Sequence, residues 1–299
     1  MQPFWNGVLP AITTPFKVDD TVDHDFLARH ARILIDAGCR GIVPLGSLGE
    51  TATLTFDEKR AVIRTLVSAL QGRAPVVPGV AALSTADAAA FARMAAEEGC
   101  GGLMVLPPYV YSTDWREMRA HVAAVIAATP LPCMLYNNPI AYRTDFLPEQ
   151  VAELAAAHAN LEAVKESSAD VRRITAIRAL LRDRLRILVG VDDMVVEGIA
   201  AGATGWVAGQ VAAFPKESVT LFEMARRGEW QALRSLYEWF LPLLKLDTVP
   251  KFVQLIKLTQ ERVGLGNARV RAPRLALEGQ ELAAALAVID RAIATRPKV

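Results

Sequence analysis

Short apolar runs alternate with longer amphipathic windows along the first two thirds of the chain. Eight runs are mostly apolar from end to end, which is typical of parallel strands that are covered on both faces. They span residues 8–13, 41–45, 76–80, 102–106, 133–136, 161–165, 186–189 and 204–208. The windows between them carry apolar residues at the i, i+3, i+4 and i+7 positions and therefore predict helices. These windows span residues 25–37, 57–70, 86–98, 115–128, 148–157, 171–181 and 194–201.

About eight strand–helix units in a row favour an α/β fold of the closed (β/α)8 TIM-barrel type. An open doubly wound sheet usually has about five or six strands, and where it binds a dinucleotide it has a Gly-rich first turn. Gly38, Gly99 and Gly202 directly follow predicted helices and could provide left-handed caps before the next strand.

The apolar runs stop at about Pro215, and only helical windows follow. They span residues 216–227, 229–245, 251–263 and 280–295. Their apolar content is too high for a linker. We therefore predict a barrel over residues 1–225 and a C-terminal helical extension over residues 226–299 that packs on it.

Composition says more about the compartment and partners of the protein than about its chemistry. Of the 299 residues, 52% are hydrophobic, which is enough for a large core. The formal net charge is +1, so the chain lacks the excess of basic residues that is typical of nucleic-acid-binding proteins. Cys39, Cys100 and Cys133 are odd in number and lack a CxxC spacing, so we expect a reducing cytoplasm. No stretch resembles a signal peptide or approaches the roughly 20 apolar residues of a membrane span. We expect a cytoplasmic protein with neither a nucleic-acid nor a membrane partner.

Barrel enzymes place their active sites at the carboxyl ends of the strands. The segments that follow the predicted strands therefore hold the candidate residues: 46–50, 107–109, 136–139, 165–168 and 190–193. Gly190 and Val207, on the last two strands, are expected to contribute to substrate binding.

Lys165 is the first candidate, because it ends a strand that should be buried. Burial in an apolar barrel mouth lowers the pKa of a lysine, and the neutral amine can attack a carbonyl carbon. The simpler alternative is a lysine that forms an ion pair with Glu166 or with another carboxylate.

Tyr136 and Ser47 are the next candidates. The Tyr136 phenol could move protons between water and substrate, or it could be an aromatic side chain that only packs. Ser47 and Leu48 lie between two glycines, so their backbone N–H groups could bind a carboxylate, and Ser47 could pass a proton to Tyr136. The alternative is an ordinary tight turn.

Other chemistry has less support. His24, His30, His121 and His158 lie in or beside predicted helices without ligand spacing, so we expect no metal site. One residue of the pair Asp192 and Asp193 is expected to cap the following helix, and Cys133 is expected to be buried filler. No nucleotide-binding glycine motif follows the first strand, so no cofactor is expected.

Three motifs in order carry a family resemblance: GSLGE (46–50), YNNP (136–139) and VKESS (164–168). With them, essentially the whole chain resembles the N-acetylneuraminate lyase / dihydrodipicolinate synthase family of class I barrel lyases. The resemblance implies a Schiff base on Lys165, a proton shuttle at Tyr136 and a substrate carboxylate held by the amides of Ser47 and Leu48. It also implies a homotetramer.

Departures from the family pattern bear on the substrate. Dihydrodipicolinate synthases usually have GTTGE, a Tyr-Tyr pair after the fourth strand, and an Arg five residues after the catalytic tyrosine. Here these positions hold Leu48, Tyr109-Val110 and Ala141. These losses argue against dihydrodipicolinate synthesis, and Leu48 also breaks the Ser-Thr pair of the neuraminate lyases.

The combination of GSLGE, YNNPIAY, VKESSADVRRI and GWVAGQVAAFP most resembles bacterial 1-pyrroline-4-hydroxy-2-carboxylate deaminases. That reaction would give 2,5-dioxopentanoate and ammonia from a small cyclic 2-imino acid. An aldolase or dehydratase of 2-keto-3-deoxy sugar acids is an alternative, although it would need more polar residues than segments 141–144 and 214–219 offer. A non-catalytic sensor of keto acids is an alternative from another class of protein.

Overall fold

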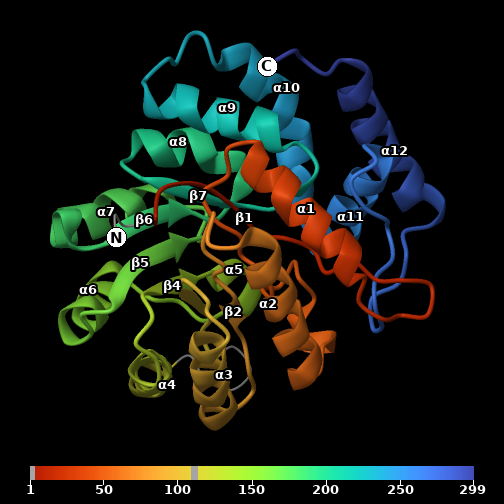
Figure 1. Cartoon of the computed structure of the whole chain (residues 1–299). Helices are drawn as coiled ribbons and strands as arrows, with labels where there is room; N and C mark the ends of the chain where they lie inside the picture. The colour runs from red at the N-terminus through yellow and green to blue at the C-terminus, as the bar shows by residue number, and fades with distance from the viewer. Residues whose placement is uncertain (1–3, 109–113) are drawn as a thin grey trace.

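The computed structural model describes residues 4–108 and 114–299, and its strands form one parallel, curled sheet with helices around it (Figure 1). Seven strands are hydrogen bonded in the order β1-β7-β6-β5-β4-β3-β2. Their bounds are β1 Gly7–Pro10, β2 Gly79–Val80, β3 Leu103–Val105, β4 Cys133–Asn137, β5 Leu161–Glu166, β6 Arg186–Val189 and β7 Gly205–Ala208.

The predicted strand at residues 41–45 joins the two edges of this sheet by isolated bridges. Ala11 pairs with Val43 and Ile42 pairs with Val76, both in parallel. The Val43 N–H donates to the Pro10 carbonyl at 2.8 Å. All eight apolar runs of the sequence therefore lie around one sheet.

Helices cover the outside of the sheet. Their bounds are α1 His24–Asp36, α2 Phe56–Leu70, α3 Thr85–Glu97, α4 Trp115–Ala127, α5 Pro139–Tyr142, α6 Pro148–Ala157, α7 Val171–Leu181, α8 Val195–Ala200, α9 Pro215–Arg226, α10 Arg234–Leu244, α11 Phe252–Arg262 and α12 Gly279–Ala294. Gly38, Gly99 and Gly202 have φ angles of 104°, 82° and 108°, so the predicted left-handed caps are confirmed. The four-residue helix α5 was not predicted.

Side chains on each strand alternate between the inside of the curled sheet and the helical layer. On β5, Ala163 belongs to the inner apolar cluster and Val164 to the cluster that faces the helices. Lys165 is two residues beyond Ala163 and so faces inward, whereas Glu166 faces the helices.

Helices α10, α11 and α12 lie beside the curled sheet near the C-terminus of the chain (Figure 1). Helix α11 contacts the 46–50 loop, because Leu48 packs in one cluster with Val253 and Ile256. The Lys257 Nζ lies 2.5 Å from the Glu50 Oε1, and both side chains are almost fully buried. The C-terminal segment is thus attached to a loop that carries candidate site residues. Within residues 4–108 and 114–299, no helix is long and apolar enough to cross a bilayer.

Candidate active site

Lys165 and Tyr136 lie side by side at the carboxyl ends of β5 and β4. The two residues are register partners in the parallel ladder. Both side chains are 6% exposed, and the Lys165 Nζ lies 4.2 Å from the centre of the Tyr136 ring. Two inward-facing residues of neighbouring strands thus place an amine and a phenol in one buried space.

The Lys165 amine is easier to deprotonate than an ordinary lysine. Burial lowers its pKa from 10.5 to about 8, against the opposing effect of the Asp247 and Asp192 carboxylates. Glu166 does not pair with it: its carboxylate accepts hydrogen bonds from the Asn137 Nδ2 at 3.0 Å and from the Ser168 N–H at 2.7 Å. At pH 7 about one amine in ten would be neutral, which suits a nucleophile.

Gly190 gives the lysine stem its space. A Cβ at this position would overlap the Ser167 Oγ and would lie 2.6 Å from the Lys165 Cε. Gly190 therefore forms the wall against which Lys165 lies, and its expected contact with substrate stays a prediction.

The Tyr136 hydroxyl accepts a hydrogen bond from the Asn138 Nδ2 at 2.9 Å. Burial raises the pKa of the phenol to about 12, and the nearby Asp247 carboxylate also acts to raise it. Tyr136 is therefore a neutral phenol near pH 7. A positive charge on the adjacent Lys165 nitrogen would lower its pKa.

Tyr142 connects Ser47 to Tyr136. The Ser47 Oγ is hydrogen bonded to the Tyr142 hydroxyl. The Tyr142 ring meets the Tyr136 ring edge to face, with centroids 5.7 Å apart at 89°, and Tyr142 also interacts with the Tyr136 hydroxyl. In the sequence, Tyr142 was only one of the few polar residues of segment 141–144. In the structure, the short helix α5 brings its hydroxyl between those of Ser47 and Tyr136.

The 46–50 loop is a tight turn whose residues are buried, except for the half-buried Ser47. Leu45 and Glu50 have positive φ angles of 61° and 52°, and a Cβ on Gly49 would lie 2.8 Å from the Leu45 nitrogen. Among the backbone hydrogen bonds of the described residues, none is donated by the Ser47 or Leu48 amide. Both amides suit a carboxylate acceptor, while the Leu48 side chain packs away against α11.

Val207 lies on β7 and is 1% exposed. It belongs to the inner apolar cluster that also contains Tyr136, Leu188 and Ala163. It thus forms part of the apolar floor beside Tyr136.

Neither Asp192 nor Asp193 caps the following helix, because α8 has no side-chain cap, so that expectation is wrong. Asp192 is fully buried and accepts hydrogen bonds from the Trp206 Nε1 at 3.0 Å, the Gly209 N–H at 3.1 Å and the Gln210 N–H at 2.9 Å. The 3₁₀ helix η3, Asp192–Met194, has no side-chain cap. These donors hold the carboxylate beside the site.

Asp247 is a site residue that sequence reasoning missed. It ends the 3₁₀ helix η5, Lys245–Asp247, between α10 and α11. Its Oδ1 lies 2.6 Å from the position of a Cβ on Gly209, and burial, followed by the nearby Asp192 charge, raises the pKa of its carboxyl. It interacts electrostatically with both Lys165 and Tyr136. No spacing or motif in the sequence points to a residue so far from the strand ends.

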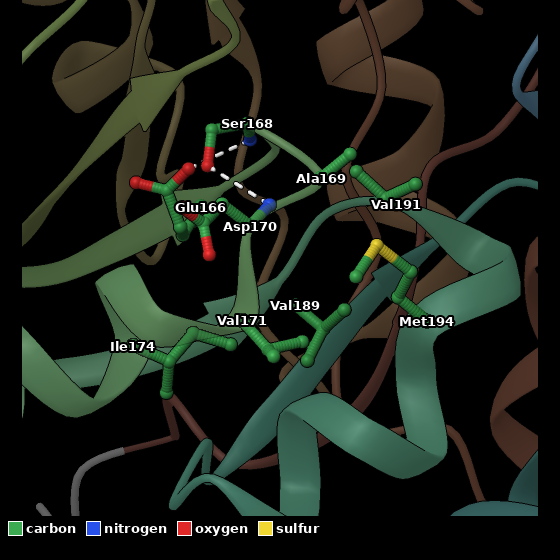
Figure 2. A pocket seen from close by; sticks show the side chains of 9 residues that line it. All are labelled: Glu166, Ser168, Ala169, Asp170, Val171, Ile174, Val189, Val191 and Met194. Atoms are coloured by element: carbon green, nitrogen blue, oxygen red, sulfur yellow. Dashed lines mark hydrogen bonds between the residues drawn. The ribbon is translucent and has the colours of Figure 1, made fainter.

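A small hollow on the opposite face of β5 and β6 holds the turn that follows Lys165 (Figure 2). Its polar side carries Glu166, Ser168 and Asp170, and the Asp170 N–H donates to the Ser168 Oγ at 3.3 Å. Lys165 and Tyr136 do not line it. The hollow thus belongs to the support of the site and not to the space around the amine.

Three further expectations concerned residues 109–110, Cys133 and a metal site. Tyr109 and Val110 lie outside the described residues. Cys133 is buried, and burial raises the pKa of its thiol to about 12, as expected for filler. In residues 4–108 and 114–299, no group of three or more His, Cys, Asp or Glu side chains is arranged to hold a metal ion.

Comparison with known proteins gives one consistent family. The dihydrodipicolinate synthetase family matches residues 5–292. A 4-hydroxy-tetrahydrodipicolinate synthase of Methanosphaerula palustris is 30% identical over 96% of this chain and 99% of its own length. The corresponding protein of Methanoculleus marisnigri is 32% identical over 90% of this chain and 93% of its own length.

Solved structures agree with this result. Dihydrodipicolinate synthase DapA-2 of Bacillus anthracis superposes with a TM-score of 0.92 at 26% identity, covering 98% of this chain and 99% of its own. The chloride-inhibited dihydrodipicolinate synthase of Acinetobacter baumannii, complexed with pyruvate, superposes with a TM-score of 0.91 at 25% identity, covering 96% of this chain and 99% of its own.

Proposed function

This chain is an enzyme of the dihydrodipicolinate synthetase family, a class I Schiff-base lyase family, and we propose that its Lys165 forms a Schiff base with a small 2-oxo or cyclic 2-imino acid. The observation that carries the proposal is the buried contact between the Lys165 amine and the Tyr136 ring at 4.2 Å. A structural relative is complexed with pyruvate, which has the same 2-oxo acid group.

We propose 1-pyrroline-4-hydroxy-2-carboxylate as the substrate. Its carboxylate would accept hydrogen bonds from the Ser47 and Leu48 amides. The five-membered ring is compact and suits a site whose floor is apolar around Val207 and Leu188. Gly190, beside the lysine stem, would leave room for C2 of the ring near the amine.

The proposed reaction begins when the neutral Lys165 amine adds to C2 of the cyclic imine. Transimination opens the ring, and the protonated Schiff base then withdraws electrons from C3. The cationic nitrogen lowers the pKa of Tyr136, which gives up its phenol proton through Tyr142 and Ser47 to solvent, and the resulting phenolate takes a proton from C3. The hydroxyl leaves from C4, and hydrolysis then releases ammonia and 2,5-dioxopentanoate.

The hydroxyls of Ser47, Tyr142 and Tyr136 provide a proton path for these steps. Ser47 and Tyr142 are directly hydrogen bonded, and Tyr142 interacts with the Tyr136 hydroxyl. All three residues belong to the same chain. The proposed path therefore needs no tyrosine from another subunit.

Synthesis of 4-hydroxy-tetrahydrodipicolinate is the second candidate, because relatives near 30% identity carry that name. It requires a site for a second carboxylate substrate. Ala141 stands where those enzymes usually have an arginine, and the neighbouring Arg143 is exposed. The deaminase is therefore the better-supported proposal.

Borohydride trapping tests the Schiff base. Wild-type protein treated with pyruvate and borohydride should gain the mass of one reduced adduct, and Lys165→Ala should gain none. The same adduct on Lys165→Ala would refute the assignment, and no adduct on wild type would favour a sensor.

Product assays then separate the reactions. Release of ammonia from the hydroxypyrroline acid identifies the deaminase, and pyruvate-dependent consumption of aspartate semialdehyde identifies the synthase. Cleavage of a 2-keto-3-deoxy sugar acid would identify the aldolase. Only the first result supports the proposed substrate.

We also propose that the chain forms one (β/α)8 barrel over residues 1–225 with the helical extension 226–299 packed on it. The proposed assembly is a homotetramer in the cytoplasm. Sedimentation equilibrium of the purified protein tests the assembly, because a monomer or dimer would contradict it.

A further inference from the structure

The motif at residues 136–139 contains two asparagines with different surroundings. Asn137 is fully buried, and its Nδ2 donates to Glu166, which faces the helices. Asn138 is half-buried and turns toward the site, because its Nδ2 donates to the Tyr136 hydroxyl at 2.9 Å. The reaction proposed above assigns no role to this second amide.

The orientation of the Asn138 amide follows from its other hydrogen bond. Its Oδ1 accepts from the Ala141 N–H at 2.9 Å, as the N-cap of helix α5. A backbone N–H only donates, so this side-chain atom must be the oxygen and the other must be the NH2 group. The NH2 group also only donates, so the Tyr136 oxygen is the acceptor. The amide is thus fixed with a donor against the phenol.

This donor leaves the phenol proton to another neighbour. A phenol has one O–H, and where its oxygen accepts from Asn138 its proton points elsewhere. The Tyr142 ring lies edge to face with that of Tyr136 at 5.7 Å, and the Tyr142 hydroxyl is hydrogen bonded to Ser47. Asn138 holds this second tyrosine too, because its backbone carbonyl accepts from the Tyr142 N–H at 3.0 Å. One residue therefore holds both phenols of the proposed proton path.

A hydrogen bond to the phenol oxygen also favours the ionised phenol, because such a bond strengthens when the acceptor gains a negative charge. Burial raises the pKa of Tyr136 to about 12, and the hydrogen bond from Asn138 opposes that rise. Among the charged groups nearby, the Lys165 nitrogen lies 4.2 Å from the ring, and the Asp247 charge acts to raise the pKa of the phenol. Once Lys165 is a cationic imine, the cation and the Asn138 amide together stabilise a phenolate.

We propose that Asn138 is the positioning residue that makes Tyr136 a base, because its NH2 group directs the phenol proton to Tyr142 and then holds the phenolate. The proton passes from Tyr136 to Tyr142 and Ser47 and on to solvent. The phenolate oxygen then takes a proton from C3 of the substrate. This inference rests on the proposed Schiff base at Lys165 but not on the identity of the substrate.

Three substitutions separate this role from capping of α5. Asn138→Ser keeps an oxygen that can cap a helix, but its hydroxyl is too short to reach the phenol. Asn138→Asp also keeps the cap and replaces the NH2 group by an oxygen that only accepts. Asn138→Ala removes both the cap and the donor. Each variant and wild type are assayed with pyruvate for exchange of the methyl protons with heavy water, over a range of pH.

The expected loss depends on pH. At pH 7 all three variants should exchange about 10-fold more slowly or worse, because hydrogen bonds to charged groups are the stronger ones. At saturating pyruvate, where Lys165 is already an imine, the pH midpoint of the rate should move up by about one unit in Asn138→Ser and further in Asn138→Asp. The pyruvate concentration for half-maximal exchange should change by less than about twofold, since the Ser47 and Leu48 amides are unchanged.

The pattern among the variants decides the result. Wild-type exchange in Asn138→Ser with a loss only in Asn138→Ala would show that Asn138 merely caps α5. A loss of equal size at every pH, with an unchanged midpoint, would show that the amide does not act on the phenolate. Either outcome, or wild-type exchange in all three variants, overturns the proposal.

A carbon-13 NMR signal gives a reading that needs no substrate. The ring carbon that carries the Tyr136 hydroxyl, assigned with Tyr136→Phe, has a chemical shift that responds to hydrogen bonding at the oxygen. This shift should change in Asn138→Ser and Asn138→Ala alike, and an unchanged shift would overturn the role of Asn138. If wild type forms no adduct with pyruvate, the proposed function fails, and the shift still shows whether the amide acts on the phenol.

Discussion

The environment of Lys165 determines whether its amine can react. An exposed lysine is almost fully protonated at pH 7 and has no lone pair for attack. Lys165 is buried beside an aromatic ring, and this lowers its pKa, while Asp192 and Asp247 keep the pKa from falling further. The two effects leave a mixture of both protonation states near neutral pH. That suits the proposed role of Lys165, in which the amine first attacks as the free base and later becomes a cationic imine.

The rate of trapping by borohydride should follow the neutral fraction of Lys165. Because the pKa of this amine is about 8, the initial rate with pyruvate should fall about tenfold per pH unit below pH 8 and level off above it. The measurement is adduct mass against time between pH 6 and 10. A midpoint near 10 would mean that the amine behaves as an ordinary lysine.

Tyr142→Phe should slow proton transfer without preventing formation of the Schiff base. The variant keeps the edge-to-face ring contact with Tyr136 but loses the hydroxyl that bonds to Ser47. We expect exchange of the pyruvate methyl protons with heavy water, followed by NMR, to fall by about 10-fold to 100-fold. Tyr136→Phe should lose at least as much.

The adduct yield is the control for this prediction. It should match that of wild type, because Lys165 is untouched. If exchange in Tyr142→Phe equals that of wild type, the proton does not pass through this hydroxyl.

At the scale of elements, the 46–50 loop is held from outside the sheet. The buried ion pair between Glu50 and Lys257 joins the loop to α11, and Lys257 also donates to the Arg269 carbonyl at 2.6 Å. The Arg271 N–H donates to the second Glu50 oxygen at 3.1 Å. The backbone that should bind the substrate carboxylate is therefore positioned by a C-terminal helix.

Lys257→Met should destabilise the protein by about 3–5 kcal/mol, because it leaves the Glu50 charge buried without its nearer counter-ion, while Arg274 stays 3.9 Å away. Urea unfolding measures the change in the free energy of unfolding. Lys251→Met is the control, since its partner Glu281 is exposed, and it should cost at most about 1 kcal/mol. The double variant Lys257→Met/Glu50→Gln should recover part of the loss. Equal effects of the two single variants would contradict the importance of burial.

Sequence patterns predicted the elements better than the contacts between them. The strand ends placed Lys165 and Tyr136 on neighbouring strands, and the parallel register then brought them together. The segment at residues 41–45 was also predicted, because it is apolar along its whole length although it forms only isolated bridges with its neighbours. Tyr142 could not be placed, since a four-residue helix has too little periodicity to show itself.

The sequence did not predict contacts between residues that lie far apart in the chain. One residue of the pair Asp192 and Asp193 was expected to cap a helix, because an acidic residue before a helical window usually does so. The true donors to Asp192 lie on residues 206–210, and only the closing of the sheet brings them near. Lys257 lies in a window that has the pattern of an ordinary amphipathic helix, and Asp247 lies in the short gap between two such windows.

On the scale of the whole molecule, the C-terminal segment completes the site. It contributes Lys257 beside Glu50 of the 46–50 loop, the apolar surface on which Leu48 packs, and Asp247, whose charge raises the pKa of Lys165. It is also tied to the last helix of the alternating part, where Arg296 pairs with Glu217 at 2.5 Å. Contacts of this kind should make the two proposed parts fold together.

We therefore expect one cooperative unfolding transition for residues 1–299. Thermal unfolding followed by far-ultraviolet circular dichroism and by tryptophan fluorescence should give coincident curves. A chain that ends at residue 225 should bind a hydrophobic dye and lack that transition, because the partners of Leu48 and Glu50 on α11 are gone. Residue 225 lies at the end of α9, so the cut itself interrupts no strand. If this shortened chain melts cooperatively at the temperature of the full chain, the extension is an independent addition and the barrel does not depend on it.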